Sequence, residues 1–228
     1  MTNHPLGEEI YAAYAAGALS GPMRLLVDAQ AAVEPEVARE RERAEAAAGL
    51  LLETAEPAPM APGALKAALA AIDAEEAGLG EAGPASGARM TKAAQAAGQA
   101  LDELLALPEP VRALALEQGG WSFAGPGVRR MELMREGVAK AELIRIEPGR
   151  GVPHHGHDCR EFTLVLRGAF QDGMGRYVAG ELCATDPSVE HKPVADAGDV
   201  CIALAVTDGP LVFTGPLGWA QRILGAMN

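Results

Sequence analysis

The composition of this 228-residue chain changes abruptly part of the way along it. Residues 1 to about 80 are rich in Ala, Glu and Leu and contain few β-branched residues, whereas the chain from about residue 120 onward carries Val, Ile, Gly and Pro in short runs. The first pattern is typical of helices and the second of short strands joined by turns. We therefore predict an α+β chain of several domains, in which a small N-terminal helical bundle is followed by an antiparallel β-barrel or jelly roll.

The first part of the chain shows apolar residues at helical spacing, interrupted by Gly and Pro. This pattern predicts four short helices, at Leu6–Tyr14, Met23–Val33, Pro35–Leu51 and Leu65–Ile72. Their apolar stripes are mostly Ala, which buries little area, so the unit would be marginal alone and is expected to lean on a partner or a second copy, including a homodimer. The Gly-rich composition that follows predicts a flexible linker. The boundaries we infer are residues 1–76 for the helical domain, 77–98 for the linker and 99–228 for the β domain.

Short apolar runs separated by turn sequences such as EPGRG and QDGMG predict the strands of the second part. A preceding amphipathic segment ends at the sequence LPEPVR, residues 107–112, where we expect helical character to stop. The predicted strands are Val128–Met134, Val138–Ile146, Phe162–Phe170, Cys201–Val206, Leu211–Thr214 and Gln221–Leu224.

Candidate metal ligands are concentrated in residues 149–168, GRGVPHHGHDCREFTLVLRG. His155, His157 and Glu161 share one parity, so a strand would direct all three side chains to the same face. A further candidate, His191, follows a Gly-rich turn that could return the chain along the neighbouring strand. Imidazoles with a carboxylate suit a divalent ion such as zinc, manganese, iron or nickel. The adjacent His154 has the opposite parity and is expected at the surface or behind the ligands.

The spacing from Gly149 through His155, His157 and Glu161 to Gly168 matches the first metal motif of the cupin superfamily, G(X)5HXH(X)3,4E(X)6G. The second cupin motif is represented by Gly180-Glu181 and His191 and lacks the usual preceding Pro. The run TLVLRGAFQDGMGRYVAGE, the LPEPVR segment and the sequence AYAAGALS near the N-terminus further resemble the ChrR family of anti-sigma factors. The resemblance implies one divalent metal ion in the cupin, with zinc as the expected ion, and the ligands His155, His157, Glu161 and His191.

The resemblance also implies a function for the two parts of the chain. In that family a helical zinc domain binds an extracytoplasmic-function sigma factor, and the cupin responds to oxidative stress. The first zinc ligand of the helical domain corresponds to His4, but the other ligand positions carry Gln30, Glu34 and Val37. These residues cannot rebuild a thiolate site, so we expect no zinc in the N-terminal domain. A small metal-dependent cupin enzyme of the dioxygenase type is the alternative function, and we favour regulation over catalysis.

Charge and cysteine content restrict the partners and the compartment. The chain has 31 acidic and 19 basic residues, a formal net charge of −12, which disfavours direct binding to nucleic acid. No segment reads as a membrane span or an export leader, and the sparse cysteines fit a reducing cytoplasm, where we expect the protein. Of the three cysteines, Cys159 lies between candidate ligands, where a nearby cation could favour its thiolate and make it an oxidant sensor, but we favour an inert buried thiol. Cys183 and Cys201 are expected to pack as small apolar residues.

Overall fold

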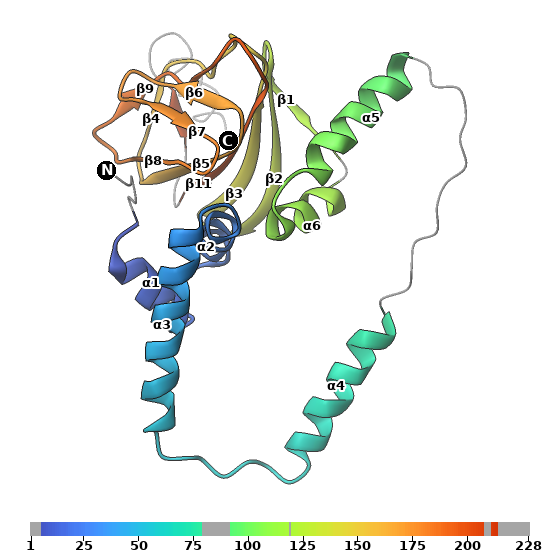
Figure 1. Cartoon of the computed structure of the whole chain (residues 1–228), viewed down its shortest axis with the longest axis vertical. Coiled ribbons are helices and arrows are strands. Elements are labelled where there is room, and N and C mark those ends of the chain that lie inside the picture. Colours follow the sequence, from blue (N-terminus) through green and yellow to red (C-terminus); the bar gives the residue numbers. More distant parts are fainter. Residues whose placement is uncertain (1–5, 79–91, 119, 208–210, 214–228) are drawn as a thin grey trace, which may run out of the picture.

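A computed structural model describes residues 6–78, 92–118, 120–207 and 211–213 of the chain. Helices come first and strands follow, as predicted (Figure 1). The helices are α1 Glu8–Ala15, α2 Gly21–Val33, α3 Pro35–Glu53, α4 Ala64–Gly78, α5 Lys92–Leu105 and α6 Glu109–Glu117. The strands are β1 Ser122–Gly125, β2 Val128–Glu136, β3 Ala139–Ile146, β4 His155–His157, β5 Glu161–Arg167, β6 Ala169–Gln171, β7 Arg176–Val178, β8 Leu182–Thr185, β9 Glu190–His191, β10 Val194–Ala195, β11 Cys201–Thr207 and β12 Leu211–Phe213. Within these ranges, no helix is long and apolar enough to span a membrane.

Glycine and proline set the ends of the first three helices. Gly17, at φ 68°, follows α1 in the left-handed conformation that an L side chain rarely adopts. Pro22 and Pro35 lie in the first turns of α2 and α3, where a missing N–H costs nothing. Glu34 connects these two helices, and its carboxylate accepts a hydrogen bond of 3.4 Å from the backbone N–H of Glu36. The four helices predicted for the first part of the chain are therefore present.

The expectation that helical character stops at LPEPVR is wrong. The sequence from Glu109 onward forms helix α6, with Pro110 in its first turn and with Val111 and Ala115 buried. Proline at the first positions of a helix is compatible with helical geometry, because the N–H groups there have no partner within the helix. The prolines of this segment therefore mark the start of a helix.

The strands form a closed antiparallel architecture made of three sheets. A six-stranded sheet has the order β1-β2-β3-β11-β5-β8, and two three-stranded sheets have the orders β10-β6-β7 and β12-β4-β9. The predicted strand Phe162–Phe170 is divided at Gly168, where the chain passes from the large sheet to the β10-β6-β7 sheet. Gly168 has a φ of 71°, and a Cβ added there would lie 2.3 Å from the carbonyl oxygen of Val200. Only glycine fits this crossing, which accounts for its place in the motif.

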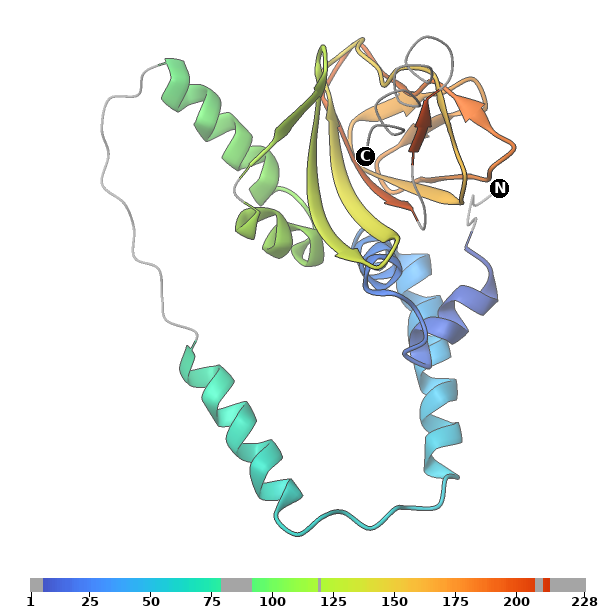
Figure 2. The same ribbon diagram turned by 180° about the vertical axis from the view of Figure 1, so that it is seen from behind.

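Helices α2 and α6 pack on the outer face of the six-stranded sheet, and α1 and α3 pack against α2 and against each other (Figures 1 and 2). One apolar core joins Leu26 of α2 with Phe162 of β5 and Leu204 of β11. A second core fills the barrel interior and includes Val165, Phe170 and Cys201. Because successive strand residues point to opposite faces, β5 contributes Phe162 and Leu164 to the helix-facing core and Val165 to the interior. Helix α2 thus buries its apolar stripe against the barrel.

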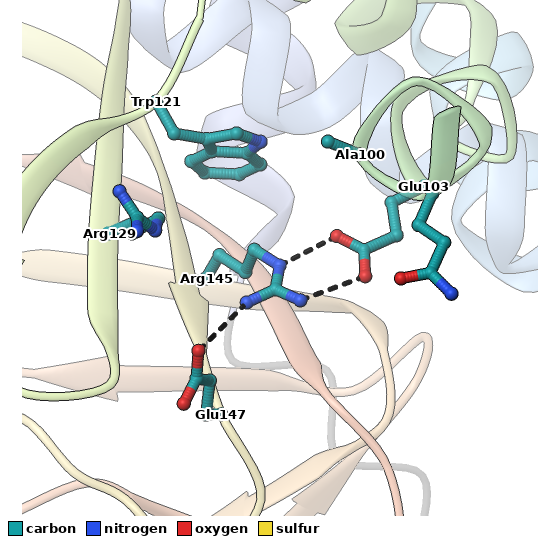
Figure 3. Close-up of a pocket in the computed structure, with 7 residues that line it drawn as sticks. Ala100, Glu103, Trp121, Arg129, Arg145 and Glu147 are labelled. Carbon is teal, nitrogen blue, oxygen red and sulfur yellow. Dashed lines mark hydrogen bonds and ion pairs between the residues drawn. The ribbon is translucent and has the colours of Figure 1, made fainter. Parts of the chain in front are cut away.

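Helix α5 is tied to the sheet by a charged pair. Arg145 of β3 donates from Nε to Glu103 Oε2 at 2.6 Å and from Nη2 to Glu103 Oε1 at 2.9 Å, in a bidentate arrangement (Figure 3). The ring of Trp121 lies across from this pair, and a pocket of about 370 Å³ opens between them, with Arg129 and Glu147 at its edge (Figure 3). This contact fixes the segment that enters the β domain.

Candidate metal centre

Two short strands bring together histidines that are 36 residues apart in the sequence. In the antiparallel pair β4·β9, His155 lies directly opposite His191. Directly opposed residues project to the same face of a sheet, so the two imidazoles meet, with ring centroids 4.6 Å apart. Both side chains are buried. The prediction that His191 returns on the strand beside His155 is confirmed.

Hydrogen bonds on the far side of each ring determine the proton positions at this pair. Nδ1 of His155 lies 2.8 Å from the carbonyl oxygen of Pro153, and Nδ1 of His191 lies 3.1 Å from Asp172 Oδ2. These oxygens accept hydrogen bonds, so we assign the imidazole proton to Nδ1 in both rings. Each Nε2 then carries a lone pair.

The two Nε2 atoms face each other at 3.2 Å. Two lone pairs at this distance repel unless a cation lies between them. Protonation of His155 does not supply this cation at neutral pH, because burial lowers the pKa of the imidazole to about 4. Two nitrogens bound to one tetrahedral zinc ion at ordinary bond lengths are about 3.3 Å apart. The pair therefore fits a divalent metal ion.

Glu161 completes a three-residue group with the histidines. Its carboxylate and the ligand nitrogens of His155 and His191 all lie within 4.8 Å of one another, and all three residues are buried. Glu161 begins β5, whereas His155 lies on β4 in a different sheet, so closure of the barrel unites them. The prediction that one strand directs His155 and Glu161 to the same face is therefore wrong, because residues 158–160 interrupt the strand. The two residues lie together because strands of two sheets meet.

Hydroxyl groups surround Glu161. Thr163 Oγ1 donates to Glu161 Oε1 at 3.0 Å, and in the sheet Glu161 lies between Thr185 of β8 and Thr207 of β11. The buried hydroxyls of Thr185 and Thr207 have no hydrogen-bond partner among the described residues. Unpartnered buried donors are rare, and here they lie beside the candidate ligands, where an ion with its remaining oxygen ligands would satisfy them. The site is therefore polar as well as enclosed.

Other candidate residues are placed as follows. His157 is the last residue of β4, and its side chain lies outside what the structure describes. His4 lies wholly outside the described residues. His154 is exposed at the surface, 3.8 Å from Glu190. Gln30 and Val37 are buried in the helical core, and Glu34 caps α3. His157 stays a predicted ligand.

Asp172 and Cys183 form a second buried group with His191. Sequence analysis missed this group, because Asp172 belongs to the QDGMG segment that indicated only a turn. Burial raises the pKa of the Cys183 thiol to about 12 and that of the Cys201 thiol to about 12, so both remain protonated. The expectation that Cys201 packs as a small apolar residue is confirmed, whereas Cys183 also makes polar contacts.

Comparison with known proteins identifies the family. The family model of the ChrR cupin-like domain matches residues 112–211. The anti-sigma-E factor ChrR of Cereibacter sphaeroides is 33% identical over 210 residues, which cover 92% of each protein. The chain belongs to the ChrR family. The crystal structure of Rhodobacter sphaeroides SigE in complex with the anti-sigma ChrR aligns with a TM-score of 0.67 and 32% identity, covering 91% of this chain and 100% of that chain. The ChrR-type architecture thus extends over nearly the whole molecule.

The protonation of Glu161 gives a pH-dependent prediction for this ChrR-family chain freed of metal by a chelator. Burial raises the pKa of Glu161 from 4.5 to about 7. Between these values the unfolded carboxyl is ionised while the folded one is protonated, so the unfolded chain binds fewer protons and stability falls as pH rises. The unfolding free energy of Glu161→Gln should therefore gain about 2–3 kcal/mol relative to the wild type between pH 5 and pH 8.

Urea titrations of both proteins at the two pH values measure this gain. Glu117→Gln, at an exposed carboxylate on the last residue of α6, is the control and should show no comparable gain. An equal gain in both variants would contradict a raised pKa at Glu161.

Proposed function

We propose that this chain is an anti-sigma factor, in which the helical part binds an extracytoplasmic-function sigma factor and the cupin senses oxidative stress through a bound metal ion. The observation that carries this proposal is the full-length similarity to ChrR, including the ChrR chain that was crystallised with SigE. Both the helices and the barrel are covered by that similarity. The proposed place of action is the cytoplasm, where sigma factors meet RNA polymerase.

Exposed apolar side chains on α3 and α4 supply a surface for such a partner. Leu50, Leu51 and Leu52 at the end of α3 are 66%, 72% and 75% exposed. Three consecutive exposed leucines are unusual on a helix, because solvent-facing positions are normally polar. Large exposed apolar residues continue beyond them at Met60, Leu65, Leu69 and Ile72.

A groove lies beside the exposed leucines. It has a volume of about 540 Å³ and runs between the end of α1 and the second half of α3; it is lined by Ala15, Ala16, Glu45, Ala48, Gly49, Leu51, Leu52 and Ala55. The small alanine and glycine side chains leave room for apolar side chains of a partner helix. Residues 1–80 contain 13 acidic and 5 basic residues, so the surrounding surface favours a basic partner.

The metal site we propose consists of His155, His157, Glu161 and His191, with zinc as the expected ion. Its support is the facing Nε2 pair, the buried carboxylate and the match of spacing to the cupin motif. Two or three imidazoles and one carboxylate bind zinc well, and manganese, iron and nickel accept the same donors. When bound, the ion would supply a positive centre that holds strands from two sheets together.

A pull-down with the extracytoplasmic-function sigma factors of the same genome tests the sigma interaction. The wild-type chain should retain one of them, and Leu51→Glu combined with Leu52→Glu should weaken binding by about 10–100-fold, because two apolar contacts are replaced by charges. The control is Phe123→Glu, the same type of change at a 73% exposed residue of β1. Retention of no sigma factor by the wild type would refute the proposal, and equal losses in both variants would refute the assigned surface.

A further inference from the structure

Asp172 is a buried carboxylate with a partner on each oxygen. It lies in the turn between β6 and β7, and its side chain is 0% exposed. Oδ1 accepts hydrogen bonds from the backbone N–H groups of Met174 at 3.0 Å and Gly175 at 3.2 Å. Oδ2 accepts from His191 Nδ1 at 3.1 Å and from Cys183 Sγ at 3.6 Å. One oxygen therefore holds the turn, and the other faces the candidate metal ligand.

The surroundings explain why this carboxylate can be buried. A carboxylate removed from water costs several kcal/mol unless donors replace the lost hydration. The four donors around Asp172 are two backbone amides, a thiol and an imidazole. The hydroxyl of Tyr177 in turn hydrogen-bonds to Cys183, so the thiol is also held in place. The carboxylate is fixed from three directions.

We propose that Asp172 is the positioning residue for His191. It holds the proton of His191 on Nδ1, directs the Nε2 lone pair toward His155, and places a negative charge behind a metal ligand. Such outer partners orient a ligating imidazole and increase its basicity. This inference rests on the proposed metal site and is independent of sigma binding.

A different use of the same atoms would be a second metal site, because Asp172, Cys183 and His191 have ligand atoms within 4.8 Å of one another. A metal ion on Nδ1 would displace the proton that Oδ2 accepts, and the neutral ring would then carry its proton on Nε2, which would donate to Nε2 of His155 at 3.2 Å and could no longer bind an ion beside Glu161. In the positioning role, Asp172 accepts the proton of Nδ1 and one metal ion binds Nε2, so both nitrogens of His191 have a partner. The two arrangements differ in whether Cys183 is a ligand.

The test uses the purified full-length chain and the substitution Asp172→Asn. Asparagine can keep the oxygen that receives the turn amides, but its NH2 group then faces His191 and requires an acceptor at Nδ1. The proton should move to Nε2, which removes the lone pair that the metal needs. We expect the affinity for zinc, measured by competition with a chelator, to fall by about 10–100-fold.

Two further variants make the zinc measurement specific. Asp199→Asn is the matched control, since Asp199 is an exposed aspartate that pairs with Arg167 on the same barrel, and it should leave the zinc affinity unchanged. Cys183→Ser should also retain zinc. Loss of zinc from Cys183→Ser, or an effect of Asp172→Asn no larger than that of Asp199→Asn, would overturn the proposal.

The imidazole tautomer supplies a readout that needs no metal, and its wild-type part needs no variant. Nitrogen NMR of the histidine rings in the metal-free wild type should show His191 protonated at Nδ1, and Asp172→Asn should shift it to the Nε2-protonated form. A wild-type His191 protonated at Nε2 would refute the positioning role even if zinc binding and sigma binding both hold. Failure of sigma binding alone would leave this result intact.

Discussion

His155→Ala is expected to abolish divalent-metal binding by the purified chain. The wild type should contain about one metal ion per chain by elemental analysis, and the variant should retain almost none. His155 supplies one of the two facing Nε2 atoms, and its removal leaves His191 and Glu161 without the third described donor. The loss of affinity should exceed the ~10–100-fold that follows removal of an outer partner of a ligand.

The neighbouring residue provides a close control for this measurement. His154 carries the same side chain one position earlier, but it is exposed and faces Glu190 rather than the ligand group. His154→Ala should therefore keep the wild-type metal content, and so should His4→Ala, because we expect no zinc in the N-terminal helices. Equal metal content in His154→Ala and His155→Ala would contradict the assigned centre.

Leu26→Ala is expected to destabilise the whole protein by about 2–5 kcal/mol. Leu26 is 0% exposed in the core that α2 shares with β5 and β11, so its truncation leaves a cavity between helices and barrel. The change is measured as the shift in unfolding free energy in urea. Hydrogen exchange should show that amides of α2 and β11 lose protection together, because both elements depend on the same core.

An exposed leucine is the control that separates the effect of burial from the effect of the side-chain change itself. Leu52→Ala makes the same chemical change at a residue that is 75% exposed and should alter the unfolding free energy by less than about 0.5 kcal/mol. Loss of protection in α2 alone, with β11 unaffected in Leu26→Ala, would show that helices and barrel unfold as separate units.

The longest strands were predictable from local pattern alone. The runs that form β2, β3 and β11 are seven to nine residues long, and their apolar residues identify them without knowledge of neighbours. Strands β4 and β9 contain only three and two residues, too few for any periodicity. Their histidines were found through the spacing of the motif, and their contact depends on a register that the sequence does not display.

The components of the site that were missed are those whose role depends on the completed fold. Asp172 reads locally as a turn residue, and it does hold the turn through Oδ1. Its second oxygen reaches His191 only after β6, β8 and β9 have come together in the barrel. The helix start at Pro110 was not predicted for a related reason, since the same proline can follow the end of one helix or lie in the first turn of the next.

Two consecutive residues of β5 face the candidate metal site on one side of the strand and the N-terminal helices on the other. Glu161 points to the candidate metal ligands, and Phe162 points to the opposite side, where it shares a cavity of about 110 Å³ with Ile10 and Met23 of the helical part. A rotation or slide of this strand that relocates the carboxylate must also relocate the aromatic ring. An ion bound at the proposed site would therefore be separated from α1 and α2 by the thickness of a single strand.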